Sequence, residues 1–118
     1  MEHFYQNIGE DWFSYPNLYK RIVENSQDGA TLVEVGSWKG RSASFMAVEI
    51  INSGKDIKFD CVDTWRGTLN EEEHQQDPSV VNDTLYSEFL TNMKPVWGHF
   101  TPIRMDSVKA AELYDDAS

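Results

Sequence analysis

The stretch "TLVEVGSWKGRSASF" (residues 31–45) contains the strongest structural signal in the chain. The run over 30–35 is short, β-branched and apolar up to Glu34, as expected of a strand covered on both faces of a parallel sheet. Gly36 and Gly40 indicate a turn, and the residues from Ser42 onward have the composition of a helix, with Ser42 as its expected N-cap. The stretch therefore predicts a strand, a glycine turn and a helix whose first backbone N–H groups are open to a ligand.

Helical and strand-like patterns alternate along the rest of the chain, which indicates the α/β class. Further strands are predicted at 58–63 and 100–106, and helices at 17–26, 42–54, 82–93 and 107–116. The polar stretch over 64–80 lacks apolar periodicity and is predicted to be a long surface loop. We expect one domain over 1–118, with a leading helical region over 1–29 and a β-α-β-α-β-α unit over 30–118.

Charge and composition restrict the partners. The formal net charge is -10, which argues against nucleic acid or an anionic membrane surface as a partner. The single cysteine, Cys61, cannot form an internal disulfide, and neither a signal segment nor a long apolar run is present. A cytoplasmic protein that binds a small molecule is expected.

Acidic residues close all three predicted strands. In parallel sheets, ligands bind beyond the carboxyl ends of the strands, and an acid after the second strand can accept both hydroxyls of a ribose. Such an edge, next to a helix N-terminus that favours an anionic group, fits a nucleoside-like ligand. The three acids are Glu34, Asp63 and Asp106.

Two phosphate-binding motifs fail on the spacing of the glycine turn. The dinucleotide fingerprint requires glycine where Trp38 stands, and the P-loop requires four residues between its glycines and then a lysine, whereas three residues and then Arg41 are found here. In the remaining pattern, E-x-G-x-x-x-G, the two glycines let the backbone approach a ligand closely, and Glu34 places a carboxylate beneath the turn. This pattern suits a cationic ligand that carries its own carboxylate.

The segments "VEVGSWKGRSA", "DCVDTWRG" and "PIRMDSVKAA" resemble the class I S-adenosylmethionine-dependent methyltransferases, in particular the small-molecule O-methyltransferase-like group. The resemblance runs from about residue 11 to the C-terminus and implies a Rossmann-like parallel sheet. It implies that the glycine turn holds the methionine part of the cofactor, that Asp63 holds the ribose, and that residues after the second and third strands border the adenine. The cofactor-binding residues implied in this way are Glu34, Gly36, Ser37, Gly40, Ser42, Asp63, Thr64, Trp65, Asp106 and Ser107.

The family's domain has seven strands, and this chain ends after the third. The substrate pocket, the catalytic base and, in metal-dependent members, the Mg²⁺ ligands would lie beyond residue 118, so we expect the N-terminal half of such a domain, inactive in isolation. In the family's strand order, 3-2-1-4-5, the strand over 30–35 would be left at an apolar edge. Association of copies of the chain through that edge is expected.

Other interpretations stay open. Asp63 would also fit a nucleotide- or NAD-binding enzyme, and the open edge would fit a non-catalytic interaction module. Asp106 is also expected as the N-cap of the helix that follows it. The tryptophans are more often packing residues than ligand platforms, with Trp97 expected in core or edge packing. His74 has no second ligand at a metal-binding spacing, so no metal site is predicted.

Overall fold

The computed structural model describes residues 1–8, 16–65 and 84–112. The elements are η1 (Tyr5–Asn7), α1 (Pro16–Asn25), β1 (Thr31–Val35), α2 (Arg41–Ser53), β2 (Lys58–Asp63), α5 (Leu85–Asn92), η2 (Lys94–Val96), β3 (Thr101–Arg104) and α6 (Ser107–Ala111). The second predicted strand is confirmed residue for residue, and the other two are one to three residues shorter than predicted. Most of the predicted loop over 64–80, including His74, lies outside the described residues.

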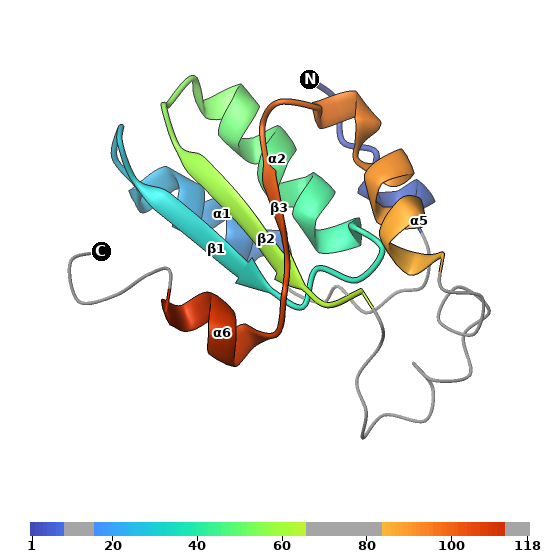
Figure 1. Cartoon of the computed structure of the whole chain (residues 1–118). Coiled ribbons are helices and arrows are strands. Elements are labelled where there is room, and N and C mark those ends of the chain that lie inside the picture. The colour runs from blue at the N-terminus through green and yellow to red at the C-terminus, as the bar shows by residue number, and fades with distance from the viewer. Residues whose placement is uncertain (9–15, 66–83, 113–118) are drawn as a thin grey trace.

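The three strands form a parallel sheet in the order β1-β2-β3 (Figure 1). In β1 and β2, Thr31 pairs with Lys58 and Val35 with Val62. In β2 and β3, Asp60 pairs with Thr101 and Asp63 with Arg104. The predicted α/β class and parallel sheet are confirmed, and β2 lies in the centre.

Helices α1 and α2 pack against each other and cover one face of the sheet. Phe59 and Cys61 of β2 lie in the hydrophobic core beneath them, and Leu32 of β1 packs against the same core. Side chains from α5 and η2 complete it, among them Phe89, which is fully buried. Because side chains alternate along a strand, Val33 and Val35 lie on the opposite face.

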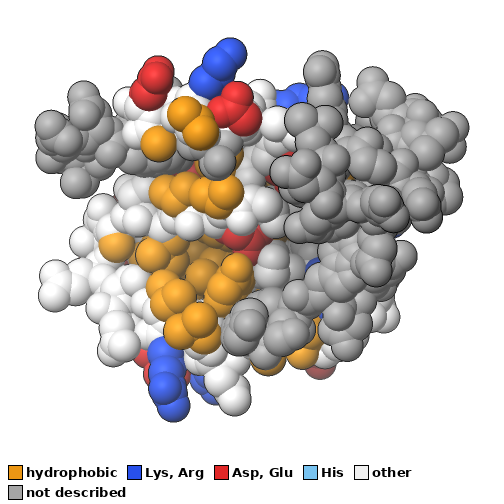
Figure 2. All heavy atoms as spheres, turned by 90° about the horizontal axis from the view of Figure 1, so that it is seen from below, with side chains coloured by type: hydrophobic (Ala, Val, Ile, Leu, Met, Phe, Trp, Pro, Cys, Tyr) orange, Lys and Arg blue, Asp and Glu red, His pale blue; other side chains and the backbone are white. Residues whose placement is uncertain are grey.

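Helix α6 packs against β2 and leaves part of that opposite face open. Val33 is 41% exposed and Val35 is 63% exposed, and Val108 of α6 is also exposed. The view from the side on which α6 lies shows hydrophobic side chains gathered on this surface (Figure 2). Within the described ranges, no helix has the length and apolar character needed to cross a membrane.

The N-terminal segment lies along α2, which the sequence did not indicate. The His3 ring stacks on Phe45 with the ring centroids 4.3 Å apart, and its Nε2 lies 3.1 Å from Glu49 Oε2. The terminal amino group of Met1 donates to Asn52 Oδ1. These contacts run along α2 from Phe45 to Asn52.

Glycines determine both ends of α2. The predicted N-cap, Ser42, is wrong: the cap is Gly40, whose φ is 96°, and it makes no side-chain capping bond. The helix ends at Gly54, as predicted, with a φ of 70°.

At α6, the predicted cap is confirmed, because Asp106 accepts a hydrogen bond from the backbone N–H of Lys109 at 2.9 Å. Trp97, expected in packing, is 62% exposed, although its ring meets Phe100 edge to face.

The two capping glycines of α2 provide a matched test of packing. A Cβ at Gly40 would lie 3.2 Å from Met93 Sδ and 3.3 Å from Phe89 Cδ1, whereas a Cβ at Gly54 would meet nothing within 4 Å. Both alanine variants bear the left-handed backbone cost of about 1–2 kcal/mol. We expect Gly40→Ala to lower the free energy of unfolding clearly further than Gly54→Ala, measured by urea denaturation. Equal losses would show that Met93 and Phe89 do not pack tightly against the turn.

Candidate functional site

The carboxylate of Asp63 joins the glycine turn to the segment after β2. Asp63 Oδ2 accepts a hydrogen bond from the backbone N–H of Trp38 at 2.9 Å, and Oδ1 accepts one from the N–H of Trp65 at 2.8 Å. Gly36 at the start of the turn donates to the carbonyl of Val62 in β2 at 2.8 Å. The turn over 36–40 is therefore fixed to the end of the central strand by a charged acceptor, which makes stronger hydrogen bonds than a neutral one.

Trp65 forms a second connection between the same two segments. Its side chain is fully buried, with the ring centroid 4.7 Å from those of both Tyr86 and Phe89. Its indole Nε1–H donates to the carbonyl of Trp38 at 2.7 Å. The described contacts of Trp65 are therefore packing and support of the turn, and its ring face is occupied by α5.

Trp38 and Trp65 both have backbone conformations that are rare for large side chains. Their φ angles are 51° and 56°, in the left-handed region. Such conformations cost on the order of 1–3 kcal/mol each and persist only where surrounding contacts hold them. Here, the hydrogen bonds to Asp63 and between the two tryptophans hold them, so the shape of the turn depends on this small network.

Glu34 lies beneath the turn, on the face covered by the helices. It is 7% exposed, and its Oε2 accepts a hydrogen bond from the Tyr19 hydroxyl of α1 at 2.8 Å. Burial raises the pKa of Glu34, and the hydroxyl of Tyr19, with smaller effects of Ser42 and Ser37, offsets only part of that rise. Among the described residues, neither Glu34 Oε1 nor Ser37 Oγ, which is also buried, has a hydrogen-bond partner. The burial thus works against the negative charge expected of Glu34.

Burial acts on the other ionisable groups around Glu34 in the same direction. It raises the pKa of Tyr19 above its usual range, and the charge of Glu34 adds to the rise. It also raises the pKa of Cys61, which is fully buried. The cluster beneath the turn therefore favours neutral groups, and Cys61 is a packing residue of the core.

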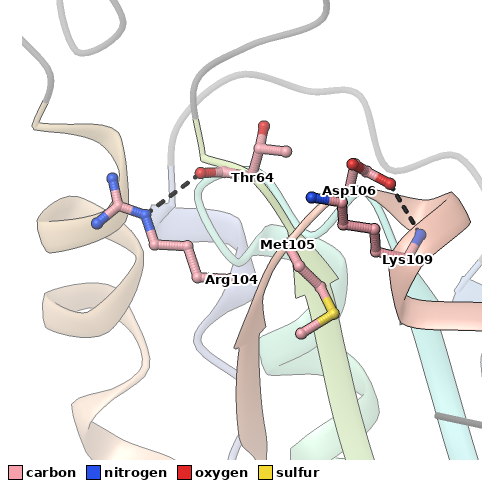
Figure 3. Close-up of a pocket in the computed structure, with 5 residues that line it drawn as sticks. All are labelled: Thr64, Arg104, Met105, Asp106 and Lys109. Carbon is pink, nitrogen blue, oxygen red and sulfur yellow. Dashed lines mark hydrogen bonds between the residues drawn. The ribbon is translucent and has the colours of Figure 1, made fainter. Parts of the chain in front are cut away.

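A pocket of about 380 Å³ opens at the carboxyl ends of β2 and β3. Figure 3 shows that Thr64 comes from the end of β2, whereas Asp106 and Lys109 come from the start of α6. Arg104 points away from this pair, and its guanidinium lies over the Tyr86 ring of α5 at 4.8 Å. The pocket is lined by Thr64, Arg104, Met105, Asp106 and Lys109.

The predicted site residues fall into two groups at one edge of the sheet. The first surrounds the glycine turn, and the second lines or borders the pocket. Ser107 begins α6 next to the pocket. The first group contains Glu34, Gly36, Ser37, Gly40, Ser42, Asp63 and Trp65, and the second contains Thr64, Asp106 and Ser107.

The structure adds residues that the sequence patterns did not single out. Tyr19 looks like one member of an amphipathic helix, and nothing in its neighbourhood indicates a bond to a carboxylate fifteen positions away. Arg104 and Lys109 line the pocket, although as isolated basic residues in an acidic chain they give no local signal. Only the position of Lys109 three residues after Asp106, in the first turn of the predicted helix, could have suggested that it lies nearby.

Among the residues that the structure describes, no group of three or more His, Cys, Asp or Glu side chains is placed to hold a metal ion. No family model matches the chain, and no curated protein matches it. The geometry of the described residues and the sequence resemblance are thus the basis for a functional proposal.

The role of the Trp65 indole can be separated from its packing. Trp65→Phe keeps an aromatic ring but removes the donor to the Trp38 carbonyl, whereas Phe89→Leu disturbs the same packing and keeps the donor. We expect the Trp38 amide proton to exchange with solvent several-fold faster in Trp65→Phe than in Phe89→Leu, after correction for global stability. Equal exchange rates would mean that the indole N–H does not support the turn.

The burial of Glu34 predicts a pH dependence of stability. Because its pKa is raised in the folded state, the folded chain binds more protons than the unfolded chain above about pH 4.3, the usual glutamate value, and stability falls as the pH rises through this window. Glu34→Gln keeps an acceptor for the Tyr19 hydroxyl and removes the titration. We expect its stability relative to the wild type, measured by urea denaturation, to increase as the pH rises above about 4.3.

The control for this comparison is Glu24→Gln, which removes the same charge from an exposed position on α1. It should leave the pH profile close to that of the wild type. A Glu34→Gln profile parallel to the wild-type profile would contradict the prediction.

Proposed function

We propose that this chain binds S-adenosylmethionine and belongs to the cofactor-binding part of a methyltransferase that acts on a small molecule. The observation that carries the proposal is the convergence of Asp63, the glycine turn and the pocket at the carboxyl edge of one parallel sheet. In open α/β sheets, ligands bind in crevices at the carboxyl ends of the strands. Among nucleoside-like ligands, we choose S-adenosylmethionine because the sequence resembles that of the methyltransferases.

Asp63 is the proposed ribose acceptor. Its two oxygens already accept backbone N–H groups, but a carboxylate offers about four acceptor positions. Two hydroxyls of a ribose can therefore bind without displacing the amides that shape the turn. Under this proposal, the Asp63 carboxylate organises the turn in the free protein and also accepts hydrogen bonds from the ribose hydroxyls when the cofactor binds.

The pocket next to Asp63 is the proposed adenine site. Thr64 and Asp106 offer polar groups at its edge, and Met105 contributes an apolar, polarisable side chain. The methionine carboxylate would lie against the first turn of α2, where backbone N–H groups favour an anion. Because burial raises the pKa of Glu34, the attraction for the sulfonium comes, in this proposal, from Asp63 and from the net charge of -10 rather than from Glu34.

Methyl transfer from this cofactor needs little covalent chemistry from the protein. A lone pair on an acceptor oxygen or nitrogen attacks the methyl carbon, the carbon–sulfur bond breaks, and its electron pair returns to sulfur as a neutral thioether. The acceptor's proton leaves to a base. The described residues proposed here position the cofactor, and we assign no base among them.

Calorimetry with S-adenosylhomocysteine and with NAD tests the proposal. We expect S-adenosylhomocysteine to bind and NAD to compete weakly or not at all. Tighter binding of NAD would favour the nucleotide-enzyme alternative, and no binding of either ligand would favour an interaction module.

A thermodynamic cycle tests the ribose contact itself, since Asp63→Asn alone would also disturb the turn. Removing the 2′-hydroxyl from the ligand should weaken binding to the wild type by about 1.5–3 kcal/mol, the range for a hydrogen bond to a charged group. The same removal should weaken binding to Asp63→Asn much less. An equal loss in both proteins would remove Asp63 from direct contact with the ribose.

A further inference from the structure

Strand β1 has an open edge that solvent reaches. It pairs with β2 on one side, and among the described residues no strand pairs with its other side. Thr31, Val33 and Val35 are all exposed. An open edge of this kind fits another strand better than any other partner, because its unpaired N–H and C=O groups repeat at strand spacing.

Two backbone hydrogen bonds show which residues of β1 direct their N–H and C=O groups toward β2. The backbone N–H of Lys58 donates to the carbonyl of Ala30 at 2.9 Å, and the backbone N–H of Gly36 donates to the carbonyl of Val62 at 2.8 Å. Even-numbered residues of β1 therefore direct their N–H and C=O groups toward β2. The odd-numbered ones, Thr31, Val33 and Val35, direct theirs outward.

The outward groups are self-complementary. If a second β1 runs antiparallel with Val33 opposite its own copy, Val33 exchanges two hydrogen bonds with that copy, and Thr31 exchanges two with Val35. All five residues of the strand are then paired. Any shift along the strand leaves outward groups at one end unpaired.

The single ionisable residue of β1, Glu34, favours the same arrangement. In the Val33-centred pairing, Glu34 lies opposite Leu32 of the second copy. An antiparallel pairing centred on Glu34, or a parallel pairing in register, would bring two Glu34 side chains together, and like groups placed side by side are unfavourable when charged. The edge is also free of the lysine and proline residues that commonly block strand pairing.

We propose that two copies of this chain associate through β1, antiparallel and about a two-fold axis at Val33, to form one continuous six-stranded sheet. A two-fold axis normal to the sheet keeps the α1 and α2 layers of both copies on one face. It also brings the exposed Val33 side chains together on the other face. The proposal does not depend on the cofactor.

The expected association is modest. A pair of five-residue strands is shorter than the contact of a standard stable interface, so we expect dissociation in the micromolar range rather than below it. Sedimentation or light scattering across that range should show a concentration-dependent shift from monomer to dimer. A monomer at concentrations well above the micromolar range would overturn the proposal.

Two lysine substitutions form a matched pair for this measurement. Val35→Lys places a charge on the proposed interface, whereas Val108→Lys makes the same change on α6, at a valine that is more exposed still. We expect Val35→Lys to weaken the dimer at least ten-fold and Val108→Lys to leave it unchanged. The reverse order would assign association to the α6 surface and overturn the proposal.

Cysteine cross-linking tests the register. Val33→Cys would put two cysteines opposite each other, with Cα atoms about 5.5 Å apart, within the range of a disulfide. Val35→Cys would place them more than about 13 Å apart, since each residue adds about 3.4 Å along a strand. The native Cys61 is fully buried.

We expect mild oxidation to cross-link Val33→Cys into a dimer and to leave Val35→Cys largely uncross-linked. Efficient cross-linking of Val35→Cys, or none of Val33→Cys in a chain that still dimerises, would overturn the proposed register.

Discussion

The hydrogen bonds of the Asp63 carboxylate hold the carboxyl edge of the sheet in shape. One oxygen binds the N–H of Trp38 in the glycine turn, and the other binds the N–H of Trp65 after β2. Both tryptophans have left-handed backbone conformations that need such support. Without this acceptor, the turn would keep the hydrogen bond from Gly36 to the Val62 carbonyl of β2. It would lose the bonds that hold the backbone of Trp38 and Trp65.

This arrangement places a charged group where a ligand is expected while keeping the charge satisfied. Asp63 is partly exposed and bonded through both oxygens, whereas Glu34, two residues before the turn, is buried and bonded to Tyr19. Burial raises the pKa of Glu34, so the two acids that the sequence presents as equivalent strand-end residues differ in character. One forms part of the accessible edge, and the other belongs to the interface between sheet and helices.

Much of the fold could be predicted from short-range patterns. The run over 58–63 forms β2 as predicted, with Phe59, Cys61 and Val62 buried, because the central strand of a parallel sheet is covered on both faces. Gly54 ends α2 and Asp106 begins α6 because helix caps depend on local backbone chemistry. Ser42 was wrong as a cap because the helix begins directly after the turn, at Arg41, and Gly40 provides the left-handed backbone conformation that leads into it.

The residue types and their order were sufficient to predict the α/β class, the parallel sheet and the edge at which Asp63, Thr64 and Asp106 lie, because strand ends in a parallel sheet meet at one side whatever the details of packing. Only the tertiary structure decided which side chains face one another across that edge. Trp65 could have been a ligand platform by sequence, but α5 packs over its ring and its N–H binds Trp38. The protonation preference of Glu34 likewise depends on Tyr19 and the surrounding core, residues distant in sequence, because desolvation is a property of the packed interior and not of the local chain.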